Sequence, residues 1–253
     1  MKAERLRLHH RRCRARAGCV LANRLSADPG LRVLLLEAGP PDRNPYIHLP
    51  AGFAKLDRQR RQLGLQHSAA ASRGQPRDVV STRPRAGGSS SINAQVYTRG
   101  HAKDYDEWAA ADGCAGWSYK DVLPYFRRAE DNQCFSNEYH GTGGPLGVSD
   151  QTSPHPITKV FLRAAQEAGL PFNPDFNGER QEGCGLYQVT QRNARRCSTA
   201  VGYLKPVLHR TNLSLADRRA YDACADREWA RSGSRGRLRF RPSARHRCAR
   251  SAR

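Results

Sequence analysis

The chain has 253 residues, a formal net charge of +20 and 38% hydrophobic residues, so it can form one large domain or two small ones around a lean core. No run of about 18 apolar residues is present, which excludes a membrane-spanning helix, and the basic N-terminus is not followed by the apolar segment of a secretory signal. Most of the charge lies in residues 1–17, 56–86 and 217–253, whose net charges are +6, +5 and +8. The sequence between these three basic blocks is close to neutral, as in an ordinary globular protein.

The eight cysteines form no CxxC pair and show no paired spacing typical of a metal site. His9, His10 and Cys13 lie close together, but a chance cluster in a basic segment explains them better than a set of metal ligands. We therefore expect no metal, reduced thiols and a cytoplasmic location.

The first basic block, residues 1–17, is polar and shows no apolar period, so we expect it to be disordered. The character of the chain then changes. Residues 18–25 are typical of an amphipathic helix with Val20, Leu21 and Leu25 on one side.

A short apolar run at residues 31–36 predicts a buried strand, and Glu37 follows it directly. A helix, a strand and an acid at the carboxyl end of that strand form the second half of a βαβ dinucleotide-binding unit. Glu37 stands 19 positions after Gly18, close to the spacing at which such a unit holds the adenosine ribose. A solvated glutamate at a strand end is the alternative interpretation.

The first half of this unit is missing. An apolar strand should run into Gly-x-Gly-x-x-Gly, whose glycines make the turn and admit the pyrophosphate. Gly18 supplies the third glycine, but Cys13 and Ala15 occupy the other two places, and residues 9–12 are His-His-Arg-Arg instead of a strand. We therefore expect an impaired pyrophosphate site.

The central motif of the chain is Gly-Gly-Ser-Ser-Ser-Ile-Asn at residues 87–93. Two adjacent glycines let the backbone turn tightly beside a ligand, and the serines offer N–H and hydroxyl donors for a phosphate or a ring carbonyl. A solvent-exposed Gly/Ser turn is the alternative interpretation.

The rest of the neutral sequence alternates helix and strand signals. We expect helices at 104–111, at 119–130 after Ser118 as N-cap, at 156–169 and from 196 to 204, and strands at 146–148, 185–191 and 211–215.

The motif at 87–93 continues through Tyr97, Gly100 and Asp106, and Gly-Trp-Ser-Tyr follows at 116–119. This series resembles the first sequence motif of the glucose-methanol-choline (GMC) family of FAD-dependent alcohol oxidoreductases. The resemblance implies an α/β fold with α+β elements, in which an incomplete Rossmann-like FAD-binding domain precedes the start of a substrate-binding domain.

The resemblance covers about residues 18–55 and 87–215. The organisation that we expect is a disordered segment at 1–17, a partial FAD-binding domain at 18–150 that is disrupted at 56–86, the start of a substrate-binding region at 151–215, and a disordered basic tail at 216–253.

In that family this loop lies against the flavin. The resemblance implies that the ADP half of FAD is contacted by Gly18, Glu37, Ala38 and Gly39, and its pyrophosphate and flavin by Gly87, Gly88, Ser89, Ser90 and Asn93. Ile92 stands where some relatives attach FAD through a histidine, so non-covalent FAD is implied. Each missing backbone donor to a buried phosphate costs about 1–3 kcal/mol, so we expect weak FAD binding.

Family members oxidise an alcohol by hydride transfer to the flavin and use a histidine near the C-terminus as base. This sequence ends before such a residue, and His101, His140, His155 and His209 are poor substitutes because each lies in a loop or surface context. We therefore expect no catalytic residue here, and a truncated, inactive fragment of a choline-dehydrogenase-like enzyme.

The basic blocks have an explanation in the genetic code. Codons for residues 9–14 can be chosen so that the neighbouring frame encodes Ile-Ile-Val-Gly-Ala-Gly, the missing strand and glycines. Residues 57–68, 78–86 and those from 216 onward can likewise hide strings that resemble the family. We hypothesise that these blocks are translated out of frame, and the gene sequence tests this.

A nucleic-acid-binding protein is the alternative function, because arginines are dense in residues 235–253 and can contact phosphates. No aromatic platform or binding motif accompanies them, and solvated disorder is the commoner state of such a tail. Salt-dependent retention on duplex DNA would favour this alternative, whereas bound flavin would favour the oxidoreductase.

Overall fold

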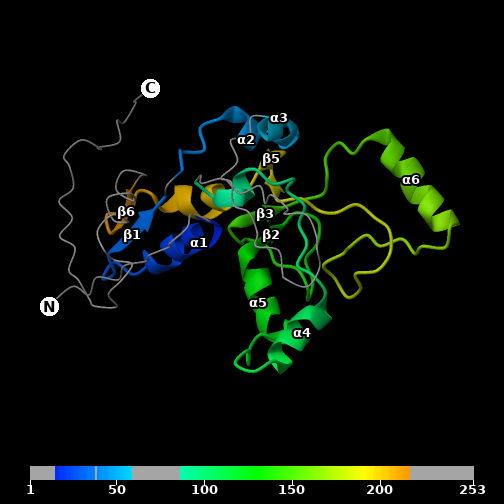
Figure 1. The fold of residues 1–253 in the computed structure, drawn as a ribbon, viewed down its shortest axis with the longest axis horizontal. Coiled ribbons are helices and arrows are strands. Elements are labelled where there is room, and N and C mark those ends of the chain that lie inside the picture. Colours follow the sequence, from blue (N-terminus) through cyan, green and yellow to red (C-terminus); the bar gives the residue numbers. More distant parts are fainter. Residues whose placement is uncertain (1–14, 38, 59–85, 217–253) are drawn as a thin grey trace, which may run out of the picture.

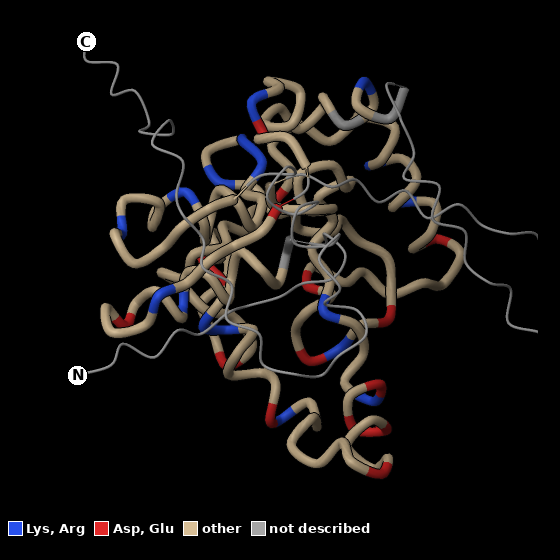
Figure 2. Tube along the Cα trace, turned by 60° about the vertical axis from the view of Figure 1, so that its left-hand side comes forward, with Lys and Arg blue, Asp and Glu red and all other residues tan. Residues whose placement is uncertain are grey.

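A computed structural model describes residues 15–37, 39–58 and 86–216 (Figure 1). The expectations for residues 1–14, 59–85 and 217–253, including the shifted reading frame and the arginine-rich tail, lie outside this range. Figure 2 shows Lys and Arg interspersed with Asp and Glu along the described chain. None of the described helices is long and apolar enough to span a bilayer.

The structure is a mixture of short helices and strands. The helices are α1 (Ala15–Leu25), α2 (Pro45–His48), α3 (Phe53–Arg58), α4 (Ala102–Ala110), α5 (Tyr119–Ala129) and α6 (Pro156–Glu167). The strands are β1 (Val33–Leu36), β2 (Glu130–Asn132), β3 (Leu146–Val148), β4 (Gln191–Arg192), β5 (Arg195–Arg196) and β6 (Leu213–Ala216). Single turns of tight or wide helix are η1 (Pro50–Gly52), η2 (Gly88–Ser91), η3 (Ala200–Leu204) and η4 (Lys205–Val207).

The main core lies where α1 covers a parallel pair of strands. β1 pairs with β6 in the register Val33 to Leu213, and the two strands lie beside α1 in Figure 1. The buried residues of this core come from α1, β1 and η3: Cys19, Ala22, Val33, Leu35, Ala200, Tyr203 and Leu204. A helix packed on parallel strands confirms the expected α/β fold.

Helix α1 differs in two ways from the sequence-based expectation. It begins at Ala15, three residues earlier, and its buried face is formed by Cys19 and Ala22, whereas Leu21 is 38% exposed. The small residues face the strands because the helix approaches them closely. A Cβ added at Gly18 would lie 3.2 Å from Leu35 Cδ1.

Helix α5 has the expected N-cap. Ser118 caps α5, with its hydroxyl accepting from the Asp121 N–H and the Asp121 carboxylate accepting from the Ser118 N–H, which is a complete capping box. Helix α5 ends at Ala129, and Glu130 begins β2, which pairs in parallel with β3. The predicted helix at 119–130 was therefore one residue too long, and β2 was not predicted.

Two other predicted elements are different in the structure. The strand expected at 185–191 is irregular as far as residue 190, with single bridges from Val189 to Val96 and Ser149, and only Gln191 belongs to a strand, β4. The helix expected from 196 starts only at η3, because β4 and β5 form a hairpin there. Asn193 and Ala194 make its two-residue turn with φ of 51° and 56°. This left-handed conformation usually indicates a glycine, and neither residue is one.

Helix α6 is amphipathic, as expected, but its apolar side is exposed. Ile157, Val160 and Phe161 are 66–68% accessible within the described part of the chain. Amphipathic spacing thus predicted the helix correctly, although no described residue covers its apolar face.

Candidate cofactor site

Helix α1, the end of β1 and the glycine-serine loop come together at one place. Burial raises the pKa of the Cys19 thiol to about 11, while hydrogen bonds with Gly87 and Thr199 lower it and the charge of Glu37 raises it further. A Cβ added at Gly18 would lie 3.2 Å from Leu35 of β1, and one added at Gly87 would lie 3.1 Å from Ala200, which packs in the same core as Cys19 and Leu35. The structure thus brings Gly18, Glu37 and Gly87 into one region.

The loop conformation requires its two glycines. Gly87 and Gly88 have φ of 83° and 56°, and a Cβ at Gly87 would lie 2.5 Å from Ser91 Oγ. Any other residue would strain the backbone and collide with the loop itself. This geometry gives the exposed-turn alternative little support, since both glycines are buried.

The serine hydroxyls do not all face a ligand, in contrast to the sequence-based expectation. Ser90 Oγ donates to Gly87 O at 2.6 Å and accepts from Thr199 N at 3.0 Å, and Ser91 Oγ donates to Ala86 O at 2.7 Å. These hydroxyls hold the loop in shape and attach it to the start of η3. Ser89 is half-buried, and its hydroxyl makes no such contact within the described part of the chain.

Glu37 lies at the carboxyl end of β1, the edge at which open α/β sheets bind ligands. It is only 5% exposed, and its Oε1 accepts from the Gly39 N–H at 2.8 Å. Ala38, between them, lies outside the described residues.

These groups match the chemistry of FAD. A buried carboxylate at a strand end suits ribose hydroxyls, and the N-terminus of the 11-residue helix α1 suits a pyrophosphate. The glycine loop admits a flat ring close to the backbone. The donor set therefore fits both ends of FAD, while the place of the second motif glycine is Ala15, the first residue of α1.

A second polar cluster, which no sequence motif indicates, connects the start of β2 to the segment after α6. Arg99 Nη2 donates to Glu130 Oε2 at 2.7 Å, and His140 lies between Glu130 Oε1 at 3.1 Å and Asp175 Oδ2 at 2.9 Å. Arg99, Glu130 and His140 are 6%, 0% and 2% exposed. We call Arg99, Glu130, His140 and Asp175 the charge cluster. No local spacing predicts it.

The sequence placed His140 in a loop or surface context, but in the structure its side chain is buried. Burial alone would lower the pKa of His140, but hydrogen bonds and charges of Asp175 and Glu130 raise it to about 9. The ring is protonated at neutral pH and both nitrogens are engaged. With both ring nitrogens held by carboxylates, His140 is poorly suited to act as a general base.

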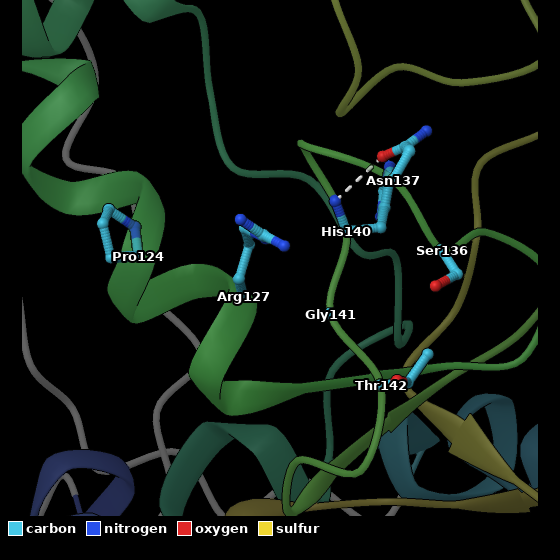
Figure 3. A pocket seen from close by; sticks show the side chains of 7 residues that line it. All are labelled: Pro124, Arg127, Ser136, Asn137, His140, Gly141 and Thr142. Carbon is cyan, nitrogen blue, oxygen red and sulfur yellow. Dashed lines mark hydrogen bonds between the residues drawn. The ribbon is translucent and has the colours of Figure 1, made fainter.

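A cavity of about 590 Å³ borders the charge cluster (Figure 3). It is lined by Pro124, Arg127, Ser136, Asn137, His140, Gly141 and Thr142. None of these residues belongs to the loop at 87–93, so this cavity and the candidate cofactor site are separate.

The charge cluster predicts a pH dependence of stability. The pKa of His140 is raised from 6.5 to about 9, so its stabilisation is complete below pH 6.5 and is lost as the pH rises through 9. The pKa values of Glu130 and Asp175 are lowered, against the effect of burial, by hydrogen bonds with His140, and their stabilisation is lost as the pH falls into the acid range. Urea midpoints should therefore decline between pH 6.5 and 9, and less steeply in His140→Gln. Identical slopes in both proteins would contradict this assignment.

The family follows from comparison with known proteins. Residues 65–222, more than half of the chain, match the description GMC oxidoreductase. The chain belongs to the GMC oxidoreductase family. It is 48% identical over 201 residues to an alcohol dehydrogenase [acceptor] of Pseudomonas putida, covering 79% of this chain and 36% of that protein. It is 45% identical over 205 residues to the mitochondrial choline dehydrogenase of Mus musculus, covering 78% of this chain and 34% of that protein.

Solved structures agree. Pyridoxine 4-oxidase from Mesorbium loti is similar with a TM-score of 0.74 and 32% identity, over 81% of this chain and 41% of that one. An FAD-dependent oxidoreductase from Chaetomium thermophilum is similar with a TM-score of 0.71 and 29% identity, over 81% of this chain and 37% of that one. The chain of this GMC protein spans about a third of the length of its curated relatives. Membership confirms the resemblance and supports FAD as the family's cofactor, while the individual cofactor contacts stay predictions.

Proposed function

We propose that this chain is the FAD-binding part of a GMC dehydrogenase that oxidises the CH–OH group of an alcohol, as the names of its alcohol- and choline-dehydrogenase relatives suggest. The observation that carries the proposal is the convergence of α1, Glu37 and the loop at 87–93. When bound, FAD would supply the hydride acceptor for this oxidation.

The chain's own residues would bind and orient the cofactor. The N-terminus of α1 and Gly18 would lie along the pyrophosphate, and Glu37, Ala38 and Gly39 would contact the adenosine half. Gly87, Gly88, Ser89, Ser90 and Asn93 would line the flavin side. Ile92 offers no group for covalent attachment, so binding would be non-covalent.

Proton removal from the alcohol needs a base, and three of the described histidines are poorly placed to supply it. His140 is protonated and held by two carboxylates, and His101 and His155 use Nδ1 to cap α4 and α6. We propose that this chain alone does not turn over alcohol, and that the base belongs to a part of the family fold outside the matched segment.

FAD binding by this chain should be weak. Two missing motif glycines, at about 1–3 kcal/mol each, weaken binding on the order of 10²–10⁴-fold relative to a complete motif. The purified chain should lack a stoichiometric flavin absorbance band, yet quench the fluorescence of added FAD reversibly. Stoichiometric flavin after purification would contradict the impairment, and no quenching at about 1 mM FAD would overturn the proposed function.

We also propose a reducing compartment, the cytoplasm. Cys19, Cys114, Cys134, Cys184 and Cys197 are all free thiols in the described part of the chain. Free thiols are the usual state of cysteine in that compartment.

A further inference from the structure

The strongest unassigned feature is Arg196, a buried cation behind the loop at 87–93. It is 2% exposed, and its Nε donates to Ile47 O at 2.6 Å. Its Nη1 donates to Ser90 O at 3.1 Å and to both Asn93 O and Asn93 Oδ1 at 2.8 Å. One guanidinium thus ties the loop to α2.

No carboxylate compensates the charge of Arg196 within residues 15–37, 39–58 and 86–216. Burial alone lowers its pKa to about 10. Its remaining nitrogen, Nη2, is buried and has no acceptor among the same residues. A desolvated cation is costly, so the backbone and amide oxygens that it does contact are held firmly.

Arg196 determines how Asn93 presents its side chain. Oδ1 of Asn93 accepts from Arg196 Nη1 and also from Gln95 N at 3.3 Å. An arginine can only donate, so the amide oxygen must face it and the Nδ2 group must face away. That Nδ2 makes no hydrogen bond within the described part of the chain, and Asn93 is half-buried.

The backbone just beyond Asn93 is strained in a way that fixes the loop exit. Gln95 has φ of 69°, a left-handed conformation that a non-glycine residue adopts only when its surroundings impose it. Its carbonyl accepts from Thr190 N at 2.8 Å, and its side chain donates to Pro50 O at 3.4 Å. The carboxamide oxygen of Asn93 therefore accepts from two donors, Arg196 and Gln95, and Gln95 is itself fixed in place.

We propose that Arg196 is a positioning residue that locks the carboxamide of Asn93, so that Nδ2 is offered as a hydrogen-bond donor to an acceptor at the edge of the bound flavin ring. The proposal rests on the proposed function, because it requires that this loop faces FAD. It adds Arg196 to the residues expected to form the site, and it specifies that Asn93 faces the ligand with its N–H donor.

The lock is tested on the protein without FAD by a double-mutant cycle. Asn93→Asp replaces the amide with an acceptor that pairs with Arg196, so the Tm should stay unchanged or rise. In the Arg196→Gln background the same change leaves a half-buried carboxylate without its cation and should lower the Tm by about 2–4 °C or more. An equal Tm shift in both backgrounds would overturn the lock.

The donor role is tested by fluorescence titration with FAD well below every Tm. Asn93→Asp removes the outward N–H while keeping the fold, so the Kd for FAD should rise at least tenfold and the visible band of bound flavin should shift. Arg196→Gln should also raise the Kd at least tenfold. Arg210→Gln is the matched control, since Arg210 donates to Asn23 O and Ser26 Oγ near the far end of α1, and should change the Kd less than twofold.

These outcomes separate the two levels of inference. If the chain without substitutions binds FAD, and Asn93→Asp has the same Kd and the same flavin spectrum, only the donor role is overturned. Absence of FAD binding by the unchanged chain would overturn the proposed function and the donor role together, whereas the double-mutant cycle still decides the lock.

Discussion

Replacing Glu130 with Ala should lower the free energy of unfolding by about 3–5 kcal/mol, the largest loss expected for a single substitution in this chain. The Glu130 side chain is fully buried and accepts from Arg99 Nη2 at 2.7 Å, Gly141 N at 3.0 Å and Asn132 Nδ2 at 3.0 Å. Its removal leaves Arg99 and His140 as buried cations without this carboxylate. Urea unfolding followed by circular dichroism measures the loss.

A matched control is the exposed pair on α6. Arg163 and Glu167 lie 2.9 Å apart, with side chains 84% and 65% exposed, so Glu167→Ala should cost less than about 0.5 kcal/mol. If the two alanine variants unfold at the same urea concentration, the charge cluster does not hold the fold together as we infer.

Restoring the missing dinucleotide motif should produce the largest gain in FAD binding. The variant carries Ile-Ile-Val-Gly-Ala-Gly at residues 10–15, which places a strand sequence before the turn and glycines at positions 13 and 15. Glycine at both positions removes the side chains that keep the pyrophosphate away from the backbone, so two N–H groups can reach it; at about 1–3 kcal/mol each, they should tighten binding on the order of 10²–10⁴-fold. Fluorescence titration with FAD measures the change.

The control for this gain separates the strand from the glycines. A variant with Ile-Ile-Val at residues 10–12 that retains Cys13 and Ala15 should recover much less affinity, because the pyrophosphate would still meet side chains where the motif has glycines. Equal affinities in the two variants would refute the role assigned to the glycines. At position 13 that role is inferred from the sequence alone.

Local signals were sufficient for the parts of the site that depend on nearest neighbours. The glycine pair at 87–88, the acid after a buried strand and the Ser118 cap are each fixed by backbone conformation within a few residues. Those signals predicted the α/β fold and the residues that converge on the candidate cofactor site. The same local logic failed at the hairpin of β4 and β5, whose exposed turn residues Asn193 and Ala194 adopt a left-handed conformation without a glycine.

The amino-acid sequence by itself therefore determined the family, the helix and strand beside the candidate cofactor site, and the glycine-serine loop next to them. Only the tertiary structure decided which charged residues are buried. Arg196 reaches Ile47 across 149 positions and Arg99 reaches Glu130 across 31, and in the sequence each is one arginine among many. The reason is physical: a buried charge is tolerated only where distant segments supply its hydrogen-bond partners, and no local pattern records where those segments meet.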